Sequence, residues 1–318
     1  METVIGSYKD IEFAAQLLQA GEVVAFPTET VYGLGGNAYS EAAIKKIFTA
    51  KGRPQDNPLI VHIANIRDLE QVAIDIPKIA YLLLDKFAPG PLTLVLKKHS
   101  NIPYQVTAGG ESVAVRIPAH EMALELIRQA NIPICAPSAN TSSRVSPTLA
   151  SHVYEDLQGK IPLILDGGSC DIGVESTVLD LTRAQPAILR PGAVTASMLA
   201  PFLNVSMAAP PDETAKSPGT KYRHYASLAK VELASTPKEA LEKLKAWDKD
   251  KAIILGSKDF IDSCKKGISL GATSAEIGRN LFATLRKVEK QFNYIIIERF
   301  PETEENIALL NRITKAIN

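Results

Sequence analysis

Short apolar runs separated by polar, glycine-containing segments fill the first two thirds of the chain. The runs have the length of strands and cover residues 23–26, 59–63, 92–96, 113–117, 132–136, 163–165, 177–181 and 187–189. Helical periodicity lies between them, over residues 10–19, 40–50, 67–74, 76–87, 120–130 and 148–157, with Ser40 as a candidate N-cap. Because several runs follow each other across short turns, the pattern predicts an α/β fold with a twisted mixed sheet flanked by helices, not a strictly parallel sheet.

The character of the sequence changes after Pro201. Residues 208–219 have no apolar periodicity and consist largely of Pro, Ala, Ser and charged residues, which is typical of a linker. Farther on, apolar runs at 231–234, 252–255 and 294–298 alternate with helical patterns at 237–247, 274–291 and 304–317. This alternation predicts a smaller Rossmann-like α/β unit with a parallel sheet. We therefore divide the chain into a first domain of residues 1–205, a linker of residues 206–229 and a C-terminal domain of residues 230–318.

The composition excludes several classes of protein. Among the 318 residues, 35 Lys and Arg balance 35 Asp and Glu, which argues against binding of nucleic acid by bulk charge and leaves only a local basic groove open. The three cysteines are odd in number and widely spaced, so neither a disulfide framework nor a zinc ribbon is indicated. No apolar run is long enough to span a bilayer, and the first residues lack the pattern of a secretory signal. We expect a soluble cytoplasmic protein without a membrane partner.

The segment after the first apolar run concentrates groups that bind ligands. Residues 27–36 mix a proline, hydroxyls and three glycines, so the backbone is expected to turn tightly beside something polar. Lys51 and Arg53 follow within one helix length, Pro54 is expected to end the helix, and Asn57 adds an amide. This set suits a polyanion such as a nucleotide triphosphate. Two cations at the end of a helix also stabilise its dipole, so Lys51 and Arg53 alone do not decide between the two interpretations.

Other strands also end in, or carry, polar residues. Residues 136–147, which include Ser138, are suited to bind phosphate or a base, or alternatively to cap the helix that begins near Thr148. Arg116 interrupts an apolar run, and a buried arginine needs an anionic partner, either an internal carboxylate or that of a substrate. His62 also lies in an apolar run, where a histidine is more often a packed core residue than a ligand.

The recurrence of such clusters at several strand ends favours one shared ligand site. Residues 173–180 and 189–192 place a further hydroxyl and a further cation at strand ends. Open α/β sheets bind their ligands at this position. No zincin, serine-hydrolase or P-loop motif is present and no nucleophile is obvious, which fits phosphoryl or nucleotidyl transfer driven by orientation and charge stabilisation.

At these residues the chain resembles the threonylcarbamoyl-adenylate synthases, a YrdC-like family, in their long two-domain form. The similarity lies in the strand-end signature at residues 27–35, the K-x-R spacing of Lys51 and Arg53, the S-x-N spacing of Ser138 and Asn140, and linker residues 217–226. The chain departs from the family pattern at Ser143, Val145 and Ser227, where Gly, Pro and Pro are expected. These departures leave the loop conformations open and do not change the class.

The resemblance implies a reaction. L-Threonine, bicarbonate or carbon dioxide, and ATP would condense to L-threonylcarbamoyl-AMP with release of pyrophosphate. The product would pass to a separate tRNA transferase that makes N6-threonylcarbamoyladenosine next to the anticodon. Magnesium is expected to be held mainly by the ATP phosphates and water, with Glu29 and Asp56 as fallback ligands and no dedicated metal site. The polar and aromatic residues Tyr222, Arg223, His224 and Tyr225 suggest that the linker folds over the site as a lid, with a passive linker as the alternative.

The resemblance also implies which residues bind the two large substrates. ATP is expected at Lys51, Arg53, Asn57, Ser112, Ser138, Asn140, Ser146, Arg190 and Tyr225. L-Threonine is expected at Thr30, His62, Arg116, Ala136 and Ser176. Lys51 and Arg53 would be the catalytic cations, Arg116 would bind the threonine carboxylate, and Ser176 would contact the threonine hydroxyl.

Two other classes of function remain as alternatives. One is a binding module that recognises RNA helices by shape without turnover. The neutral charge of the chain counts against such a module, although weak binding of tRNA is compatible with the enzyme. The other is a carbamoyltransferase of the hydrogenase-maturation type, which carries a related domain. The acylphosphatase and zinc-finger segments that accompany that domain are missing from this sequence.

Overall fold

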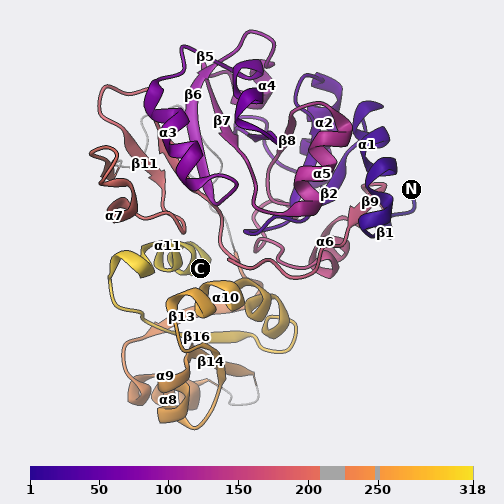
Figure 1. Ribbon diagram of the computed structural model, residues 1–318. Coiled ribbons are helices and arrows are strands. Elements are labelled where there is room, and N and C mark those ends of the chain that lie inside the picture. Colours follow the sequence, from indigo (N-terminus) through magenta and orange to yellow (C-terminus); the bar gives the residue numbers. More distant parts are fainter. Residues whose placement is uncertain (208–225, 248–250, 318) are drawn as a thin grey trace.

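The computed structural model describes residues 1–207, 226–247 and 251–317, which form two α/β units placed one above the other (Figure 1). The predicted lid residues Tyr222, Arg223, His224 and Tyr225 lie outside the described residues. Within the described ranges, no helix combines the length and the apolar character needed to cross a membrane. The predicted fold class, a mixed sheet flanked by helices followed by a smaller α/β domain, is confirmed.

The N-terminal unit is built on one mixed sheet. Its strands, in spatial order, are β1 (Val4–Gly6), β9 (Leu163–Leu165), β2 (Val24–Phe26), β3 (Gly33–Asn37), β8 (Ile134–Ala136), β4 (Ile60–His62), β7 (Ser112–Arg116), β6 (Leu92–Lys98), β10 (Thr177–Asp180), β11 (Ala187–Arg190) and β12 (Ser206–Met207), and β5 (Ala73–Ile74) pairs with β6. β2 and β3 run antiparallel, as do β3 and β8, whereas β4 and β7 run parallel. The sheet therefore has the mixed character that the short turns between runs predict.

Helices flank this sheet. They are η1 (Tyr8–Asp10), α1 (Ile11–Gln19), α2 (Glu41–Lys51), η2 (Ile66–Gln71), α3 (Lys78–Phe87), α4 (Tyr104–Thr107), α5 (Glu121–Ala130), α6 (Ala150–Leu157) and α7 (Ala196–Leu199). Ser40 caps α2 by accepting a hydrogen bond from the Ala43 amide, as predicted. α2 ends at Lys51 because Gly52 adopts the left-handed conformation (φ 60°), two residues before Pro54, which we expected to end it.

One predicted helix is wrong in part. Residues 67–74 form no single helix, since η2 ends at Gln71 and β5 follows it. β5 pairs in antiparallel register with the end of β6. Pairing with β6 makes Ala73–Ile74 a strand. The β-branched residues Val72 and Ile74 also fit a strand better than a helix.

The glycine-rich segment at residues 33–37 also differs from the expectation of a tight turn, because it forms β3 in the centre of the sheet. A Cβ atom on Gly35 would lie 2.6 Å from Cγ2 of Ile134 and 2.8 Å from Cε1 of Phe26. The missing side chain therefore lets the large side chains of both neighbouring strands pack over β3.

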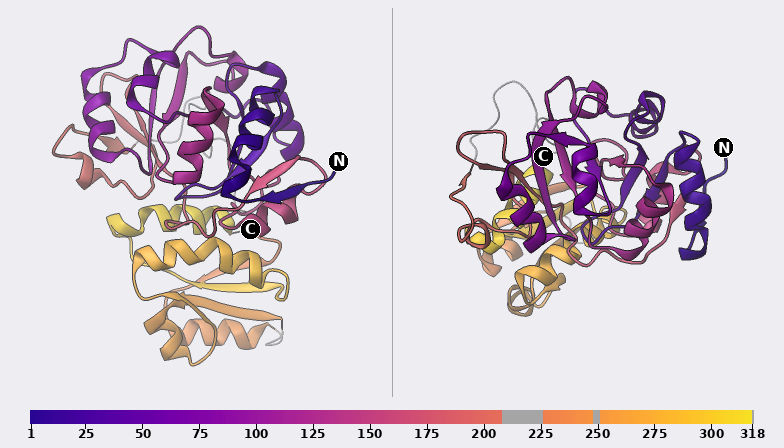
Figure 2. Two further views of the ribbon diagram at one scale, coloured as in Figure 1. Left: turned by 45° about the vertical axis from the view of Figure 1, so that its right-hand side comes forward. Right: turned by 45° about the horizontal axis from the view of Figure 1, so that its top comes forward.

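The C-terminal unit has a four-stranded sheet that is parallel throughout, as predicted. Its order is β13 (Lys230–Ala234), β16 (Tyr294–Glu298), β14 (Ala252–Ser257) and β15 (Ile268–Gly271), and its helices are α8 (Pro237–Ala246), α9 (Lys258–Cys264), α10 (Ser274–Val288), η3 (Glu304–Asn306) and α11 (Ile307–Ala316). α9 and β15 were not predicted. Figures 1 and 2 show α10 and α11 on the side of this sheet that faces the N-terminal unit, with α8 and α9 on the far side.

The apolar core of the C-terminal unit includes two residues from the other domain. Val31, from the glycine-rich motif, and Val145, from the loop after β8, are buried in the same cluster as Ile277 and Phe282 of α10. Two motifs that the sequence marks as candidate ligand sites are therefore packed directly against the second domain.

Candidate active site

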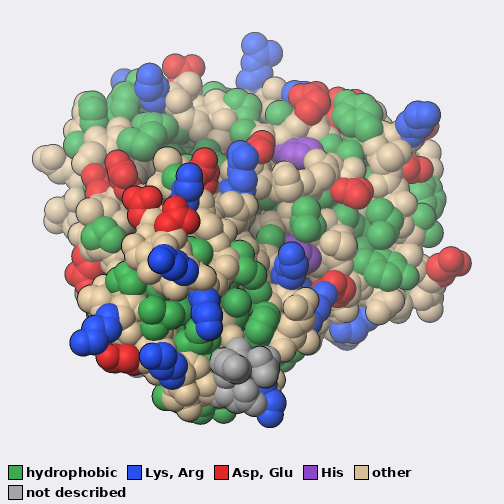
Figure 3. Space-filling view, turned by 90° about the horizontal axis from the view of Figure 1, so that it is seen from below, with side chains coloured by type: hydrophobic (Ala, Val, Ile, Leu, Met, Phe, Trp, Pro, Cys, Tyr) green, Lys and Arg blue, Asp and Glu red, His purple; other side chains and the backbone are tan. Residues whose placement is uncertain are grey.

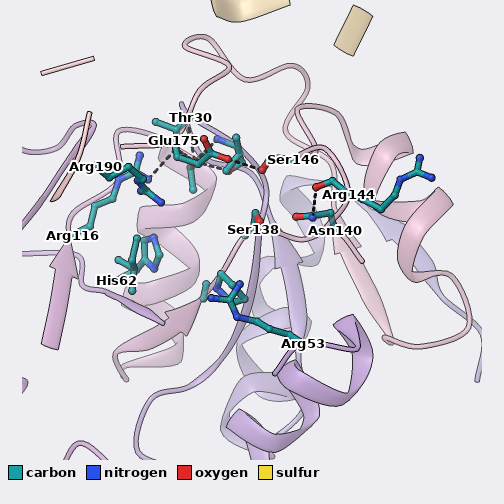
Figure 4. Close-up of a pocket in the computed structure, with 16 residues that line it drawn as sticks. Thr30, Arg53, His62, Arg116, Ser138, Asn140, Arg144, Ser146, Glu175 and Arg190 are labelled. Atoms are coloured by element: carbon teal, nitrogen blue, oxygen red, sulfur yellow. Dashed lines mark hydrogen bonds between the residues drawn. The ribbon is translucent and has the colours of Figure 1, made fainter. Parts of the chain in front are cut away.

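A pocket lies where β2, β7, β8 and β11 end, and Figure 4 shows its lining. It is lined by Thr28, Thr30, Val31, Gly33, Arg53, Ile60, His62, Arg116, Ala136, Pro137, Ser138, Asn140, Arg144, Ser146, Glu175 and Arg190. Strands that end together place side chains from distant parts of the sequence around one cavity. The structure thereby brings together these residues of the predicted site: Thr30, Arg53, His62, Arg116, Ala136, Ser138, Asn140, Ser146 and Arg190.

Arg116 comes from the end of β7 and is almost completely buried in the pocket wall. Its Nη2 atom forms an ion pair with Oε1 of Glu29 at 2.7 Å. Nη1 donates a hydrogen bond to Oγ1 of Thr30 (2.9 Å), and Nε donates to the Gly90 carbonyl (3.2 Å). The anionic partner that a buried arginine needs is therefore the internal carboxylate of Glu29. Thr30 and Arg116, both expected at the threonine site, are in direct contact.

His62, on β4, packs edge-on against Phe26 with ring centroids 5.8 Å apart. Burial, and then the nearby charge of Arg116, lowers the pKa of His62 to about 3, so the ring is neutral at physiological pH. Nδ1 has no hydrogen-bond partner among the described residues. His62 is thus packed like a core residue and also lies in the pocket wall.

Lys51 and Arg53 lie next to each other at the end of α2 but have different surroundings. Lys51 is buried behind the pocket wall, and its Nζ atom donates to the carbonyl oxygens of Ser138 and Asn140. Burial, followed by the charge of Arg53, lowers the pKa of Lys51 well below its usual value. Arg53 lines the pocket, and its Nη2 atom donates to the Pro58 carbonyl (3.2 Å). Lys51 therefore supports the loop after β8, whereas Arg53 faces the cavity.

The loop after β8 is held by its own side chains. Nδ2 of Asn140 donates to the carbonyls of Thr141 (2.9 Å) and Arg144 (2.8 Å). The Ser146 hydroxyl donates to Oε1 of Glu175 at 2.6 Å. The alternative in which this cluster caps the next helix is wrong, because α6 begins at Ala150 without a side-chain cap.

Glu175 is the second carboxylate of the pocket. Burial by itself raises its pKa, but the charges of Arg312 and Arg190 outweigh burial and, with the Ser146 hydrogen bond, hold the pKa at about 2. Nε of Arg312, from α11 of the C-terminal domain, donates to Oε2 of Glu175 at 3.0 Å. Glu175 is therefore ionised at physiological pH, and a residue of the second domain completes its environment.

Arg190 and Ser176 form one unit at the end of β11. Nε of Arg190 donates to the Ser176 carbonyl (3.0 Å), and Nη2 donates to the Ser176 Oγ atom (3.0 Å). The same hydroxyl contacts Oγ1 of Thr93 at 2.7 Å. Ser176 is completely buried and is not part of the pocket lining. The structure thus places behind Arg190 a side chain that we expected to touch the threonine hydroxyl.

Two more expected ATP residues do not line this pocket. Asn57 is buried beside Arg53, whose Nη2 atom lies 3.4 Å from the Asn57 carbonyl oxygen. Ser112 begins β7 while Arg116 ends it, a separation of about 13 Å along a strand. Ser112 instead lines a separate hollow. Tyr225 lies outside the described residues.

Three polar pocket residues had no predicted role. Thr28 holds the turn after β2, since its Oγ1 atom donates to the Val31 carbonyl (2.6 Å). Arg144 forms an ion pair with Glu289 of the C-terminal domain (2.7 Å), and Glu175 pairs with Arg312. All three lie inside the polar clusters of the sequence, which was the available signal. The partners of Arg144 and Glu175 are 145 and 137 positions away along the chain, so no local pattern indicates them.

The carboxylates around the pocket are already engaged, which bears on how magnesium would bind. Glu29 pairs with Arg116, and Glu175 pairs with Arg312. Asp56 is exposed and does not line the pocket. The part of the chain that the structure describes contains no group of three or more His, Cys, Asp or Glu side chains suited to a metal ion. Binding of magnesium mainly by the ATP phosphates and water therefore stays a prediction.

Comparison with known proteins gives matches over nearly the whole chain. Residues 16–192 match the family model Sua5_yciO_yrdC, described as telomere recombination, and residues 194–317 match Sua5_C, described as the C-terminal domain of threonylcarbamoyl-AMP synthase. The threonylcarbamoyl-AMP synthase of Pyrococcus abyssi is 46% identical over 319 residues, covering 96% of this chain and 93% of the relative. That of Bacillus subtilis is 43% identical over 321 residues, covering 95% and 91%. The crystal structure of P. abyssi Sua5 complexed with L-threonine has a TM-score of 0.90 and 43% identity, covering 99% of this chain and 97% of that one.

A mixed α/β fold with a strand-end pocket of arginines and hydroxyls, together with these matches, defines an adenylate-forming enzyme of the nucleotidyltransferase class. Within that class, the chain belongs to the Sua5/YciO/YrdC family of threonylcarbamoyl-AMP synthases, in the form that carries the Sua5 C-terminal domain. The family resemblance seen in the sequence is thereby confirmed.

Proposed function

We propose that the enzyme condenses L-threonine, bicarbonate or carbon dioxide, and ATP into L-threonylcarbamoyl-AMP and pyrophosphate. The observation that carries the proposal is the convergence of Arg53, Arg116 and Arg190 on one pocket that also holds the neutral His62. Fixed guanidinium groups suit a triphosphate and a carboxylate, and a neutral imidazole can accept a hydrogen bond from an amine. The name of the P. abyssi relative and the complex of that protein with L-threonine support the same assignment.

On the ATP side, Arg53 and Arg190 would bind the phosphates. The hydroxyls and the amide that would position the nucleotide come from Ser138, Asn140 and Ser146. Lys51 would act from behind the wall, by holding the loop that carries Ser138. Asn57 and Ser112 remain candidates that would need a nucleotide reaching beyond the lining of this pocket. Tyr225, outside the described residues, remains a candidate as well.

On the threonine side, Arg116 would bind the carboxylate, with Glu29 and Thr30 holding its guanidinium in place. His62 and the backbone near Ala136 would receive the amine, since both lie in the same wall. Ser176 would act on threonine through Arg190, which it contacts, because its own hydroxyl is buried.

The chemistry needs positioning more than reactive side chains. The amine of threonine adds to carbon dioxide, releasing a proton and leaving a carbamate. If bicarbonate is the carbon source, water is lost in place of the proton. A carbamate oxygen then attacks the α-phosphorus of ATP, and pyrophosphate leaves. Aligned cations and hydroxyls lower the barrier by orienting the two substrates and stabilising charge on the phosphates. Magnesium, when bound, would neutralise phosphate charge and would enter with ATP.

The product would be consumed by a separate transferase that modifies the adenosine next to the anticodon of tRNA. Threonylcarbamoyl-AMP is a mixed anhydride, so a pocket that excludes water would protect it. Figure 3 shows the molecule from below, where Lys and Arg side chains are dispersed among acidic and apolar ones. A net charge of zero favours transfer of the product over tight binding of tRNA by the synthase itself.

Pyrophosphate release from ATP tests this proposal. Release should require L-threonine and bicarbonate together, and omission of either should reduce it to background. L-Serine lacks only a methyl group, so a discrimination of about 1–3 kcal/mol is expected, or roughly 10- to 200-fold in kcat/KM. Pyrophosphate release that ignores threonine would refute the assignment.

A further inference from the structure

The C-terminal domain reaches the pocket wall through two arginines that are 0% and 1% exposed, Arg312 of α11 and Arg286 of α10. Arg286 donates to the Asp156 carboxylate and to the carbonyl of Val145. Arg312 donates to Oε2 of Glu175 (3.0 Å) and to the Pro191 carbonyl (2.6 Å). Burying a guanidinium is costly, so these partners hold both arginines in defined positions.

The contacts of Arg312 join two segments that line the ATP half of the pocket. Glu175 precedes β10, and Pro191 directly follows Arg190 at the end of β11. These segments touch backbone to backbone, because a Cβ atom on Gly192 would lie 2.3 Å from the Thr177 amide nitrogen. Arg312 thus bridges these two segments from the C-terminal domain. The Glu175 carboxylate that it contacts also accepts the Ser146 hydrogen bond.

We propose that Arg312 is a positioning residue for the ATP half of the pocket, which acts through Glu175 on Ser146 and holds the segment that carries Arg190. The inference rests on the proposed function and deepens it, because it makes the C-terminal domain part of the substrate site. Arg312 does not line the pocket, so its effect is transmitted by the hydrogen bonds described above.

The charges around Glu175 explain why the loss of Arg312 should matter. Glu175 faces Arg312 and Lys315 from α11, Arg190 from β11 and the Ser146 hydroxyl from the loop after β8. Without Arg312, burial would raise the pKa of Glu175, and the remaining negative charge would attract Arg190. Arg190 would then be less available to a phosphate, and Ser146 would lose a fixed acceptor.

Kinetics of full-length variants test the proposal. Arg312→Met should raise the KM for ATP by ~10-fold or more, one factor of ten for each 1.4 kcal/mol, while the KM for L-threonine changes by less than about twofold. Arg312→Lys should lie between this variant and the wild type, because it restores the charge but not the forked geometry. The matched control is Arg279→Met, which removes another arginine between the domains, one that contacts exposed Asp171 outside the pocket and should leave both KM values unchanged.

A pH profile and a double variant separate positioning from folding. Arg312→Met should move the acid limb of kcat/KM for ATP to higher pH, and Glu175→Gln in the same chain should abolish that displacement. The KM for ATP of the double variant should be no higher than that of Arg312→Met alone, because both substitutions remove the same contact. Circular dichroism and thermal unfolding report whether each chain is folded. If Arg312→Met does not fold, Glu175→Gln decides, since loss of the charge should also raise the KM for ATP.

Specific outcomes would overturn the proposal. An unchanged KM for ATP in a folded Arg312→Met or Glu175→Gln chain would contradict it. An equal rise of the KM values for ATP and for L-threonine would contradict it as well. Wild-type enzyme without threonine-dependent pyrophosphate release would instead refute the proposed function, which keeps the two failures distinguishable.

Discussion

At the scale of single residues, the cations of the pocket bond to backbone carbonyls as well as to carboxylates. Lys51 holds the carbonyls of Ser138 and Asn140, Arg53 that of Pro58, and Arg116 that of Gly90. A guanidinium has five N–H donors, so one arginine can support the wall and bind an anion at the same time. Cationic residue types are visible in the sequence, but whether a cation faces the cavity or supports it depends on the fold around it.

Replacing Lys51 by Met should separate activity from stability. Its ammonium is desolvated, as its lowered pKa indicates, so removing it should leave the melting temperature unchanged or raised. The loop with Ser138 would lose its anchor, and kcat/KM should fall roughly 10- to 100-fold, in line with a charged hydrogen bond of about 1.5–3 kcal/mol. Pyrophosphate assays and thermal unfolding measure the two effects.

The control is Lys46→Met, which removes a lysine from the same helix whose Nζ atom pairs with Glu22 at the surface (2.7 Å). It should leave kinetics unchanged. Normal kinetics in Lys51→Met as well would reduce Lys51 to an ordinary residue of a helix end.

Arg116→Lys should weaken the binding of threonine selectively. A lysine keeps the charge but cannot reach Glu29, Thr30 and the Gly90 carbonyl at once, so the carboxylate site loses its forked geometry. The KM for threonine should rise by ~10-fold or more, equivalent to about 1.4 kcal/mol, with the KM for ATP little changed. Arg183→Lys serves as control, because Arg183 is a half-exposed arginine that pairs with Asp180 away from the pocket. Equal losses toward both substrates would contradict the assignment of Arg116 to threonine.

At the scale of elements, the helices and strands that form locally are the ones that the sequence predicts well. α2 with its Ser40 cap follows from periodicity and capping, and the strands β13, β14 and β16 follow from apolar runs, all of which depend on neighbours in the chain. β3 and β5 carry no run of such length, so only their pairing with other strands makes them strands. β3 in particular has glycine at three of its five positions, a composition that by itself favours turns.

Gly35→Ala should destabilise the protein through β3. The new Cβ atom would meet Ile134 at 2.6 Å and Phe26 at 2.8 Å, so the central strands would have to move. Overpacking of this kind typically costs about 1–3 kcal/mol, measurable as a lower urea midpoint. Gly278→Ala in α10 is the control, since its Cβ atom would meet nothing closer than 3.6 Å. Alanine there should be neutral or stabilise the helix by about 0.5–1 kcal/mol. A neutral Gly35→Ala would show that the sheet adapts freely.

At the scale of the whole molecule, the two domains share both a core and a set of buried ion pairs. Val31 and Val145 belong to the core of the second domain, and Arg312 and Arg286 bring positive charge to Glu175 and Asp156 of the first. Removing one partner of such a pair leaves an uncompensated buried charge. Stability and the shape of the pocket are therefore properties of the whole chain.

The free energy of unfolding should fall with acidification in two stages. The folded protein holds the pKa of His62 at about 3 and that of His152 at about 4, below their unfolded value of 6.5. Between pH 6.5 and these values the unfolded chain binds more protons, so stability declines as the pH falls. Glu175, at about 2 against 4.5, continues the decline below pH 4.5. Both stages have the same sign, because each folded pKa is depressed.

Urea unfolding between pH 7.5 and 3.5 measures this decline. His62→Gln should flatten the upper stage, and Glu175→Gln should flatten the lower one. Stability that does not change between pH 7 and 5 would contradict the burial of neutral histidines.

The sequence alone determined the class of fold, the two domains and the polar clusters around the site, because strand length, helical period and strand-end composition are local properties. Tertiary structure decided how those clusters are used. It pairs Arg116 with Glu29, places Lys51 and Ser176 behind the wall, and brings Arg312 to Glu175 from 137 positions away. These contacts arise when distant segments are packed into one core, where buried charges must find partners, and no pattern of neighbouring residues encodes which partners they find.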